Sequence, residues 1–347
     1  AQIVAKAMAK GANVDKLAAE FADELDSLGV RVANLEKKAD NVKVTGEIRY
    51  SYRDVDGDVN GNESVLRSRL WVNGQINEDW SYTGMFENEQ DFGNETGDDK
   101  IDFARAYVEG RVGGLDVVAG RYNEVTFSGN ILDANLDMAK VSYGDKVKVS
   151  ALAGKAYDTA DNVFDSNDNE YTLQDDDRIY IGSIEAALGD VDAYVAYFKT
   201  DSSLEKEIWN VGASYNFAPD FTLAAEYMRG DKDYYNTDKD GWWADLAWKG
   251  ASADEPGSYG LHVGYFDQSA NAYITPTTDG FFTGIYDDND KLIKGSYIFD
   301  QGYKGWNVGA SWAVAKNVVA VVNYYDFEGK ENGKDADTIF SELYFSF

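Results

Sequence analysis

The chain has 347 residues and a formal net charge of −30, a balance that repels nucleic acid and disfavours phosphate-rich partners. It contains no Cys and a single His, His262, which excludes disulfides, thiolate chemistry and His-rich metal sites. No apolar run reaches the roughly eighteen residues of a transmembrane helix, whereas the alternating strands of a membrane β-barrel remain compatible with this composition.

The first forty or so residues are predicted to be helical. Residues 1–12 have the pattern of a short helix that ends at Gly11. In residues 13–41 apolar side chains recur at alternating intervals of four and three, which is the spacing of a heptad seam. An amphipathic helix packed on its own domain is the alternative, but nothing helical follows for it to pack against. We therefore predict a coiled-coil stalk with a core of Val14, Ala18, Phe21, Leu25, Leu28, Val32 and Leu35.

At Val42 the apolar period changes to two, which is the period of a β-strand. In residues 42–347, long strand-like segments are joined alternately by very short turns and by long polar loops. There are about sixteen such segments. Each has about ten residues, the length that a tilted strand needs to cross a bilayer. The sequence therefore predicts an all-β fold, a transmembrane antiparallel β-barrel. A soluble β-sandwich would also give alternating segments.

Two segments show a lipid-facing pattern most clearly, because 209–217 and 306–314 alternate large apolar residues with small or polar ones. Aromatic residues gather near predicted strand ends, as in the interfacial girdles of membrane barrels. The last ten residues alternate in the same way and end in Phe347. This ending resembles the closing strand and assembly signal of bacterial outer-membrane barrels, and the residues that carry the likeness are Tyr344, Phe345 and Phe347.

Charged residues on the opposite face of the first strands are predicted to point into the lumen. They are Glu47, Arg49, Arg67, Arg69, Glu87, Glu89, Arg105, Glu109, Arg111 and Arg121. A basic wall that faces acidic groups would create a transverse field across a pore and select solutes by charge. The alternative is that these residues form ion pairs within the wall and keep a wide barrel round.

The loop predicted at 122–137 carries apolar residues that the other loops lack. We expect it to fold into the lumen as a constriction, with Glu124, Asp133 or Asp137 facing the basic wall. The alternative is an external loop that packs on a neighbouring loop or subunit.

No catalytic residues, cofactor or metal site are predicted. His262 is expected to face the lumen, and no Ser has a positioned base. The acidic run from Asp56 resembles the start of an EF-hand loop, but Arg67 stands where the final Glu ligand is required. Weak divalent-cation binding by the acidic loops at 161–177 or 231–240 is the alternative to simple solvation of those loops.

The order of these elements resembles the porins of diderm Firmicutes, the Negativicutes OmpM type. The most specific parts are the helix 3–10, the coil through Leu35-Glu-Lys-Lys, the strand that begins at Val42 and the final Phe347. In that family an S-layer-homology domain precedes a coiled coil and a trimeric porin barrel. The resemblance implies that residues 1–12 are a remnant of that domain, 13–41 the stalk and 42–347 the barrel. It also implies homotrimers.

The expected function is passive diffusion of small hydrophilic solutes and ions across the bacterial outer membrane. The resemblance also implies that this sequence lacks most of the S-layer-homology domain. Expected partners are other copies of the chain, outer-membrane lipid and lipopolysaccharide, the barrel assembly machinery, and peptidoglycan through that domain in a full-length form. Two alternatives stay open. One is a structural tether between membrane and cell wall with a narrow or plugged barrel, and the other is a soluble sugar-binding adhesin with a β-sandwich fold.

Overall fold

A computed structural model describes residues 41–58, 60–93, 96–97, 101–157, 177–201, 205–231, 238–280, 302–330 and 333–347. The helix predicted at 1–12 and the coiled-coil core from Val14 to Leu35 lie outside the described residues, as does most of the acidic loop at 161–177. Among the described residues, no helix is long and apolar enough to cross a bilayer.

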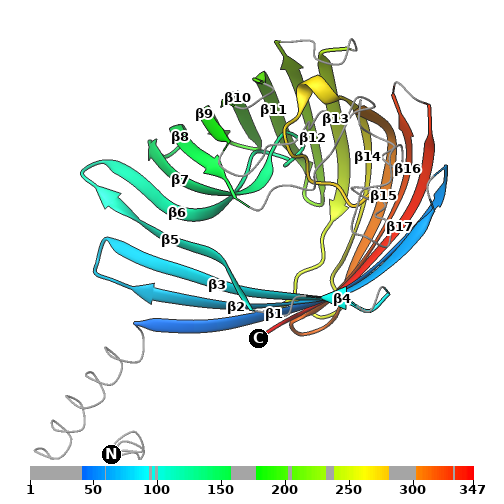
Figure 1. The fold of residues 1–347 in the computed structure, drawn as a ribbon, viewed down its shortest axis with the longest axis horizontal. Coiled ribbons are helices and arrows are strands. Elements are labelled where there is room, and N and C mark those ends of the chain that lie inside the picture. The colour runs from blue at the N-terminus through cyan, green and yellow to red at the C-terminus, as the bar shows by residue number, and fades with distance from the viewer. Residues whose placement is uncertain are drawn as a thin grey trace, which may run out of the picture.

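The described strands form one antiparallel sheet that closes on itself, because β1 pairs with both β2 and β17 (Figure 1). Sixteen strands of 10–16 residues form this ring, and the two-residue β4 extends the edge of β3, so the predicted barrel of about sixteen strands is confirmed and a two-sheet sandwich is excluded. The strands are β1 (Val42–Gly57), β2 (Gly61–Gln75), β3 (Trp80–Asp91), β4 (Thr96–Gly97), β5 (Asp102–Val112), β6 (Leu115–Val125), β7 (Asp133–Tyr143), β8 (Val147–Ala156), β9 (Arg178–Leu188), β10 (Val191–Asp201), β11 (Glu207–Ala218), β12 (Phe221–Gly230), β13 (Asp240–Lys249), β14 (Tyr259–Ser269), β15 (Gly302–Ala315), β16 (Val318–Gly329) and β17 (Asp335–Ser346).

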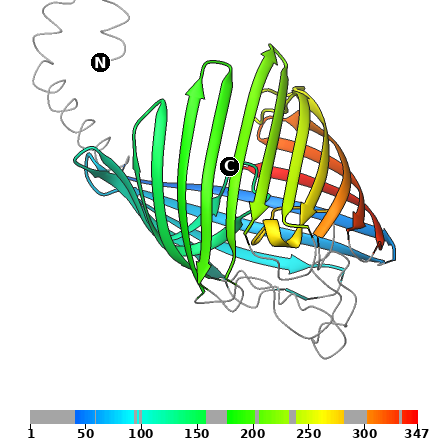
Figure 2. The same ribbon diagram turned by 90° about the horizontal axis from the view of Figure 1, so that it is seen from above.

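The two ends of the barrel differ. One end, called the turn end here, carries connections such as 113–114, 189–190 and 316–317, together with Val42 and the C-terminus (Figure 2). The other end, the loop end, carries the long connections. Gly113 and Asn317 have positive φ values of 61° and 62°, which two-residue hairpin turns require. The barrel closes between its first and last strands, where Gly46 and Phe347 exchange backbone hydrogen bonds of 2.7 and 3.0 Å.

The outer face of the barrel is apolar between two rows of aromatic rings. Along β11, Trp209, Val211 and Tyr215 are about half exposed, whereas the alternate residues Asn210 and Gly212 are buried. Ring contacts link strands near the loop end, as in Tyr197–Trp209 and Tyr265–Trp306, both with centroids 4.7 Å apart. Near the turn end Phe217, Phe221 and Trp248 stack in succession, and Trp248 meets Tyr259 edge to face. Trp209 and Phe217 are eight residues apart, about 26 Å along a strand, which spans roughly 20 Å across the bilayer at the tilt of about 40° that membrane-barrel strands have.

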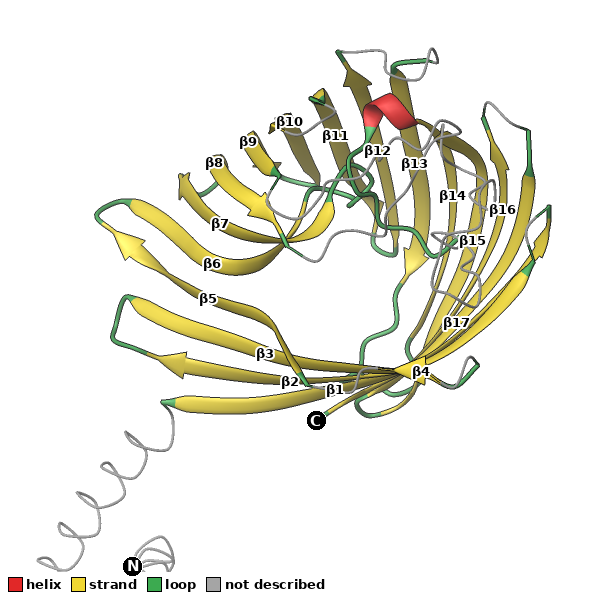
Figure 3. Cartoon of the chain, in the orientation of Figure 1, coloured by secondary structure: helices red, strands yellow, loops and turns green. Residues whose placement is uncertain are grey.

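The buried core lies inside the ring, towards its loop end. Two clusters form it, one on the inner faces of β7 to β12 and one on those of β14 to β17 and β1. Both pack against chain that leaves the wall and enters the lumen, namely residues 126–132 and the segment that begins with η1 (Ala270–Ala272) (Figure 3). The lumen is therefore partly filled at this level by its own connections.

Candidate functional site

The connection between β6 and β7 folds into the lumen. Phe127 packs on Tyr194 of β10 with ring centroids 5.6 Å apart, and its ring fills the space above Gly212 of β11. Ser128 donates a hydrogen bond to the carboxylate of Glu226 on β12, and Asn130 donates another at 3.3 Å. The connection comprises residues 126–132, so it is shorter than the predicted 122–137 because β6 and β7 continue on either side.

A second connection enters the lumen, and the sequence did not predict it. The side chain of Lys206, just before β11, is buried and donates hydrogen bonds to the carbonyls of Ala270 at 3.0 Å and Tyr273 at 2.7 Å. Burial lowers the pKa of Lys206 to about 7. This ammonium fixes the start of residues 273–280, which we call the lumen strap.

The lumen strap pairs with the first connection through the backbone. The amides of Ile274 and Thr275 donate to the carbonyl of Ile131 at 2.9 and 3.0 Å, and the amide of Thr277 donates to Gly129 at 3.0 Å. In return, the amide of Asp133 donates to Thr275 at 2.8 Å. The two connections therefore support each other as one inner layer.

The far end of the lumen strap is attached to the opposite side of the barrel. Asp279 forms an ion pair with Arg53 of β1 at 3.2 Å. The hydroxyl of Thr338 on β17 donates to the carbonyl of Gly280 at 2.7 Å. The strap thus crosses the lumen from the β11–β12 side to the β17–β1 side.

The inner face of neighbouring strands β17, β1, β2, β3 and β5 carries a charged wall. We define the charged wall as Arg49, Arg53, Arg67, Arg69, Arg105, Glu47, Glu63, Glu87, Glu89 and Glu342. Its ion pairs include Arg49–Glu342 at 3.0 Å and Arg67–Glu47 at 3.3 Å, and Arg69 bonds Glu87. Opposite residues share a face, and the register pairs Arg69 with both Glu47 and Glu87. Four of the five cations therefore form ion pairs with carboxylates, while Arg49 and Arg67 also lie opposite each other and Arg105 bonds the amide of Asn123.

Most of the predicted lumen residues of β1 to β5 come together in this wall. The exceptions lie at the turn end. Glu109 accepts a hydrogen bond from Ser81 at 3.3 Å, and Arg111 is an exposed residue paired with Asp116 at 2.8 Å beside the turn at Gly113. Arg111 therefore belongs to the rim of the barrel.

Three predicted lumen residues are on the outer face instead. Arg121 lies opposite Ala106, one residue away from the inward Tyr107, and it forms a bidentate pair with Asp137 at 2.8 and 3.1 Å. Asp133 shares the outward row of β7 with Asp137, since Ala134 and Leu136 between them pack in the core. The predicted orientation of Arg121 was wrong because β6 starts at Leu115, so Arg121 lies on the same outward face of the strand as Leu115.

The acidic residue that meets the basic side chains across the lumen is not on the predicted loop. Glu124 points inward from β6, beside the edge of the charged wall, but it is buried and paired with Lys140 of β7 at 2.6 Å. Of the predicted acids, Asp133 reaches the charged wall only through Asn123, which accepts a hydrogen bond from Arg105 at 2.9 Å and donates one to Asp133 at 2.7 Å. Direct contact with a basic side chain across the lumen is made by Asp279. No local signal marks Asp279 in the sequence, since its position depends on how the whole strap crosses the barrel.

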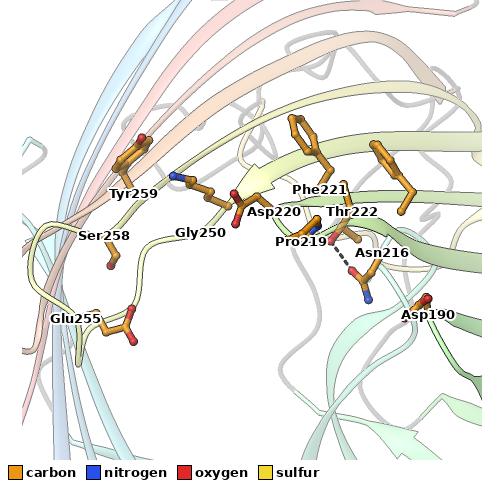
Figure 4. A pocket seen from close by; sticks show the side chains of 13 residues that line it. Asp190, Asn216, Pro219, Asp220, Phe221, Thr222, Gly250, Glu255, Ser258 and Tyr259 are labelled. Atoms are coloured by element: carbon orange, nitrogen blue, oxygen red, sulfur yellow. Dashed lines mark hydrogen bonds between the residues drawn. The ribbon is translucent and has the colours of Figure 1, made fainter.

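The described residues contain no catalytic constellation. His262 lies on the inner face between Asp245 and Asn323, with both contacts at 3.0 Å, as a member of a wall network. No group of three His, Asp or Glu side chains among the described residues could hold a metal ion. A hollow of about 770 Å³ lies at the turn-end rim between the turns at 219–220 and 250–258 (Figure 4). Its carboxylates Asp190, Asp220 and Glu255 lie with Lys249 and with Ser258, whose hydroxyl donates a hydrogen bond to the carbonyl of Ser252 at 3.2 Å. We therefore interpret the hollow as part of an acidic mouth of the barrel.

No known protein-family profile and no curated protein sequence match this chain. Solved structures do match. A point mutant of Rh. blastica porin superposes with a TM-score of 0.56 at 12% identity, covering 88% of this chain and 100% of that one. Pseudomonas putida OprB superposes with a TM-score of 0.63 at 12% identity, covering 92% of this chain and 97% of that one. The chain therefore shares the fold of these bacterial β-barrels.

Proposed function

We propose that this chain forms a water-filled diffusion channel for small hydrophilic solutes and ions across a bacterial outer membrane. The observation that carries the proposal is the arrangement of the two faces of one closed barrel. The outer face has an apolar band between two aromatic girdles, whereas the inner face carries the charged wall. Only a bilayer outside and water inside satisfy both faces. The likeness to Rh. blastica porin supports the same assignment.

The path for solutes is proposed to run between the inner layer and the charged wall. The inner layer packs on β10 to β12 through Phe127 and Glu226 and so fills part of the lumen on that side. On the side of β1 to β5, the inner layer contacts the charged wall through the ion pair of Asp279 with Arg53. The side chain of Glu89 in the wall remains 45% exposed. Solutes would therefore pass alongside charged groups at the narrowest level.

The charged wall sets a prediction for selectivity. Together with Asp279 it contains five guanidinium groups and six carboxylates, so its charges almost cancel. The overall charge of −30 then decides which ions are concentrated at the two mouths. We therefore propose a moderate preference for cations.

We also propose the homotrimer and the tether implied by the heptad pattern of residues 13–41. Val42 lies at the turn end, so a coiled coil that continues backwards from it would project from that side. The side with short turns faces the periplasm in outer-membrane barrels, which is where peptidoglycan lies. We further propose that the barrel assembly machinery recognises the end of the chain at Tyr344, Phe345 and Phe347. Phe345 and Phe347 are exposed on the outer face.

The test is reconstitution of the detergent-purified protein in a planar bilayer under a salt gradient. Ohmic steps with a cation-selective reversal potential are expected, and grouping of steps in threes would support the trimer. A well-folded protein that gives no steps would overturn the channel and favour the tether, a role that the partly filled lumen also fits.

A further inference from the structure

The single His of the chain lies in a small polar group on the inner face of β13 to β16. Nδ1 of His262 on β14 contacts the carboxylate of Asp245 on β13 at 3.0 Å, and its Nε2 contacts the amide oxygen of Asn323 on β16 at 3.0 Å. The side chain of His262 is 34% exposed, whereas that of Asp245 is 16% exposed. The imidazole is therefore held on both sides while part of it remains open to the lumen.

The contact between His262 and Asn323 crosses a whole strand. Strand β15 lies between β14 and β16, and the register places Gly309 of β15 opposite both residues. A Cβ at Gly309 would lie 2.1 Å from Nε2 of His262 and 2.0 Å from the amide oxygen of Asn323. Because any larger side chain would separate the two groups, the glycine is what lets the imidazole reach its second partner.

The pair of His262 and Asp245 is isolated from other charges on the neighbouring strands. The described residues that lie opposite the two side chains in the register are all uncharged, namely Ala224, Ala247, Gly264 and Gly309. Among the described residues that face the imidazole from β13, β15 and β16, Asp245 is the one that carries a charge. The local charge on this part of the lumen wall is therefore set by His262 and Asp245.

The net charge of this pair depends on one proton. An imidazole has an ordinary pKa of about 6.5, so a His changes its charge near neutral pH. When both ring nitrogens of His262 are protonated, each donates to the oxygen that faces it, and the pair is neutral overall. When Nε2 loses its proton, the pair carries one negative charge, and Asn323 turns its amide to donate from its nitrogen instead.

We propose that His262 determines how the ion selectivity of the channel depends on pH. The inference rests on the proposed channel function and adds a selectivity residue outside the charged wall. In acid the pair is neutral, and the charged wall and the mouths of the barrel decide the selectivity. At higher pH the pair gains a negative charge that faces the lumen, and a negative charge on a pore wall favours cations.

A second group titrates in the same range. Lys206 has a pKa of about 7, but its side chain is buried at the base of the lumen strap, where it donates to the carbonyl of Tyr273. It is unchanged in every protein compared below, so any contribution from Lys206 is common to all of them. A difference between the pH profiles therefore reports on the pair of His262 and Asp245.

The experiment measures the zero-current potential of reconstituted channels across a salt gradient at about 0.1 M, where screening is incomplete, from pH 5 to 8.5. The test variant is His262→Asn, which keeps hydrogen-bonding groups but cannot take up a proton. The matched variant is Asp245→Asn, which removes the fixed charge and keeps the imidazole. His262→Gln replaces the test variant if that protein does not fold.

In the wild type, the ratio of cation to anion permeability should rise about 1.5-fold from pH 5 to 8.5, because one negative charge is gained in the lumen. His262→Asn should have the alkaline value of the wild type at every pH, and Asp245→Asn should show the same rise from a lower starting value. A purely structural role for His262 predicts none of this. An equal rise in the wild type and His262→Asn, or a flat profile in the wild type, would overturn the inference.

The protonation of His262 can be followed without any current. Because the chain has one His, protein labelled with ¹⁵N-histidine gives the signals of a single imidazole in detergent. These signals should titrate between pH 5 and 8.5, and their failure to do so would overturn the inference. Titration with an unchanged permeability ratio refutes only the selectivity role, whereas folded proteins that give no current at all refute the channel and this role with it.

Discussion

Arg53 and Asp279 are 226 positions apart in the chain, and their side chains meet at 3.2 Å inside the barrel. Arg53 belongs to the first strand and Asp279 to the lumen strap. Arg53 also binds Glu63 of β2 at 3.2 Å, so the strap is joined to the charged wall through a cation that the wall already holds. This contact sets the distance between the inner layer and the wall at the proposed narrowest level.

The first prediction concerns this contact. Asp279→Asn should increase single-channel conductance by roughly 1.2- to 2-fold, because a partly exposed ion pair contributes about 1 kcal/mol or less and its loss only loosens the strap. Glu63→Gln is the control, since it removes a carboxylate from the same Arg53 without touching the strap. Equal conductance in the wild type and Asp279→Asn, or an equal rise in the control, would show that the pair does not limit the pore.

The second prediction concerns ion selectivity. Arg67→Gln combined with Arg69→Gln should move the reversal potential further towards cations, because two positive charges are removed from a nearly balanced wall. Arg111→Gln removes one charge from the exposed turn-end rim and should change the potential far less. The measurement is the zero-current potential across a salt gradient at about 0.1 M, where screening is incomplete. No shift in the double variant would place the current path away from this wall.

The third prediction concerns the contact between the Phe127 ring and Gly212 of β11. A Cβ added at Gly212 would lie 2.6 Å from the Phe127 ring, so Gly212→Ala should push the 126–132 connection off the wall. We expect a loss of about 1–3 kcal/mol in stability, as for overpacked cores, together with noisier open channels. Gly182→Ala is the control because nothing lies within 4 Å of its added Cβ. Thermal unfolding in detergent and channel recordings compare them, and matching behaviour would disprove the contact.

The fourth prediction concerns Lys206. Its folded-state pKa of about 7 lies below the ordinary value of 10.5, so the unfolded chain binds the proton more tightly. Wild-type stability should therefore rise between pH 7 and 10.5, and the buried charge should be most costly below pH 7. The slope is at most about 1.4 kcal/mol per pH unit.

Lys206→Met should lose this pH dependence, whereas the exposed Lys199→Met should keep it. Thermal unfolding of the wild type and both variants at pH 6, 8 and 10 tests the point. Parallel profiles for the wild type and Lys206→Met would contradict a depressed pKa for Lys206. The loss of two hydrogen bonds to the strap adds a constant offset that does not affect the comparison.

The barrel could be predicted because its information is local. Trp209, Val211 and Tyr215 alternate with Asn210 and Gly212 regardless of what happens elsewhere in the chain, and Gly113 marks a turn by itself. The alternation of side chains between the two faces of a strand also predicted the charged wall, since Glu47, Arg69 and Glu87 all lie on the inward face of their strands.

The inner layer could be predicted only in part. Apolar residues such as Ile131 and Leu132 correctly indicated a connection that packs against something. The strap carries no such signal, and the position of Asp279 depends on Lys206, Ile131 and Thr338, which are distant in sequence. Arg121 and Asp137 were misplaced because an error of one residue in a strand reverses the face of every side chain.

The central claim is that solutes pass along the charged wall, and thiol blocking tests it most directly. The chain has no Cys, so Glu89→Cys on the wall and Val211→Cys on the outer face each introduce a single thiol. Addition of a charged, water-soluble thiol reagent to open channels should reduce the current through Glu89→Cys within seconds to minutes and leave Val211→Cys unchanged. Unaltered current through a Glu89→Cys protein that mass spectrometry shows to be fully modified would contradict the account.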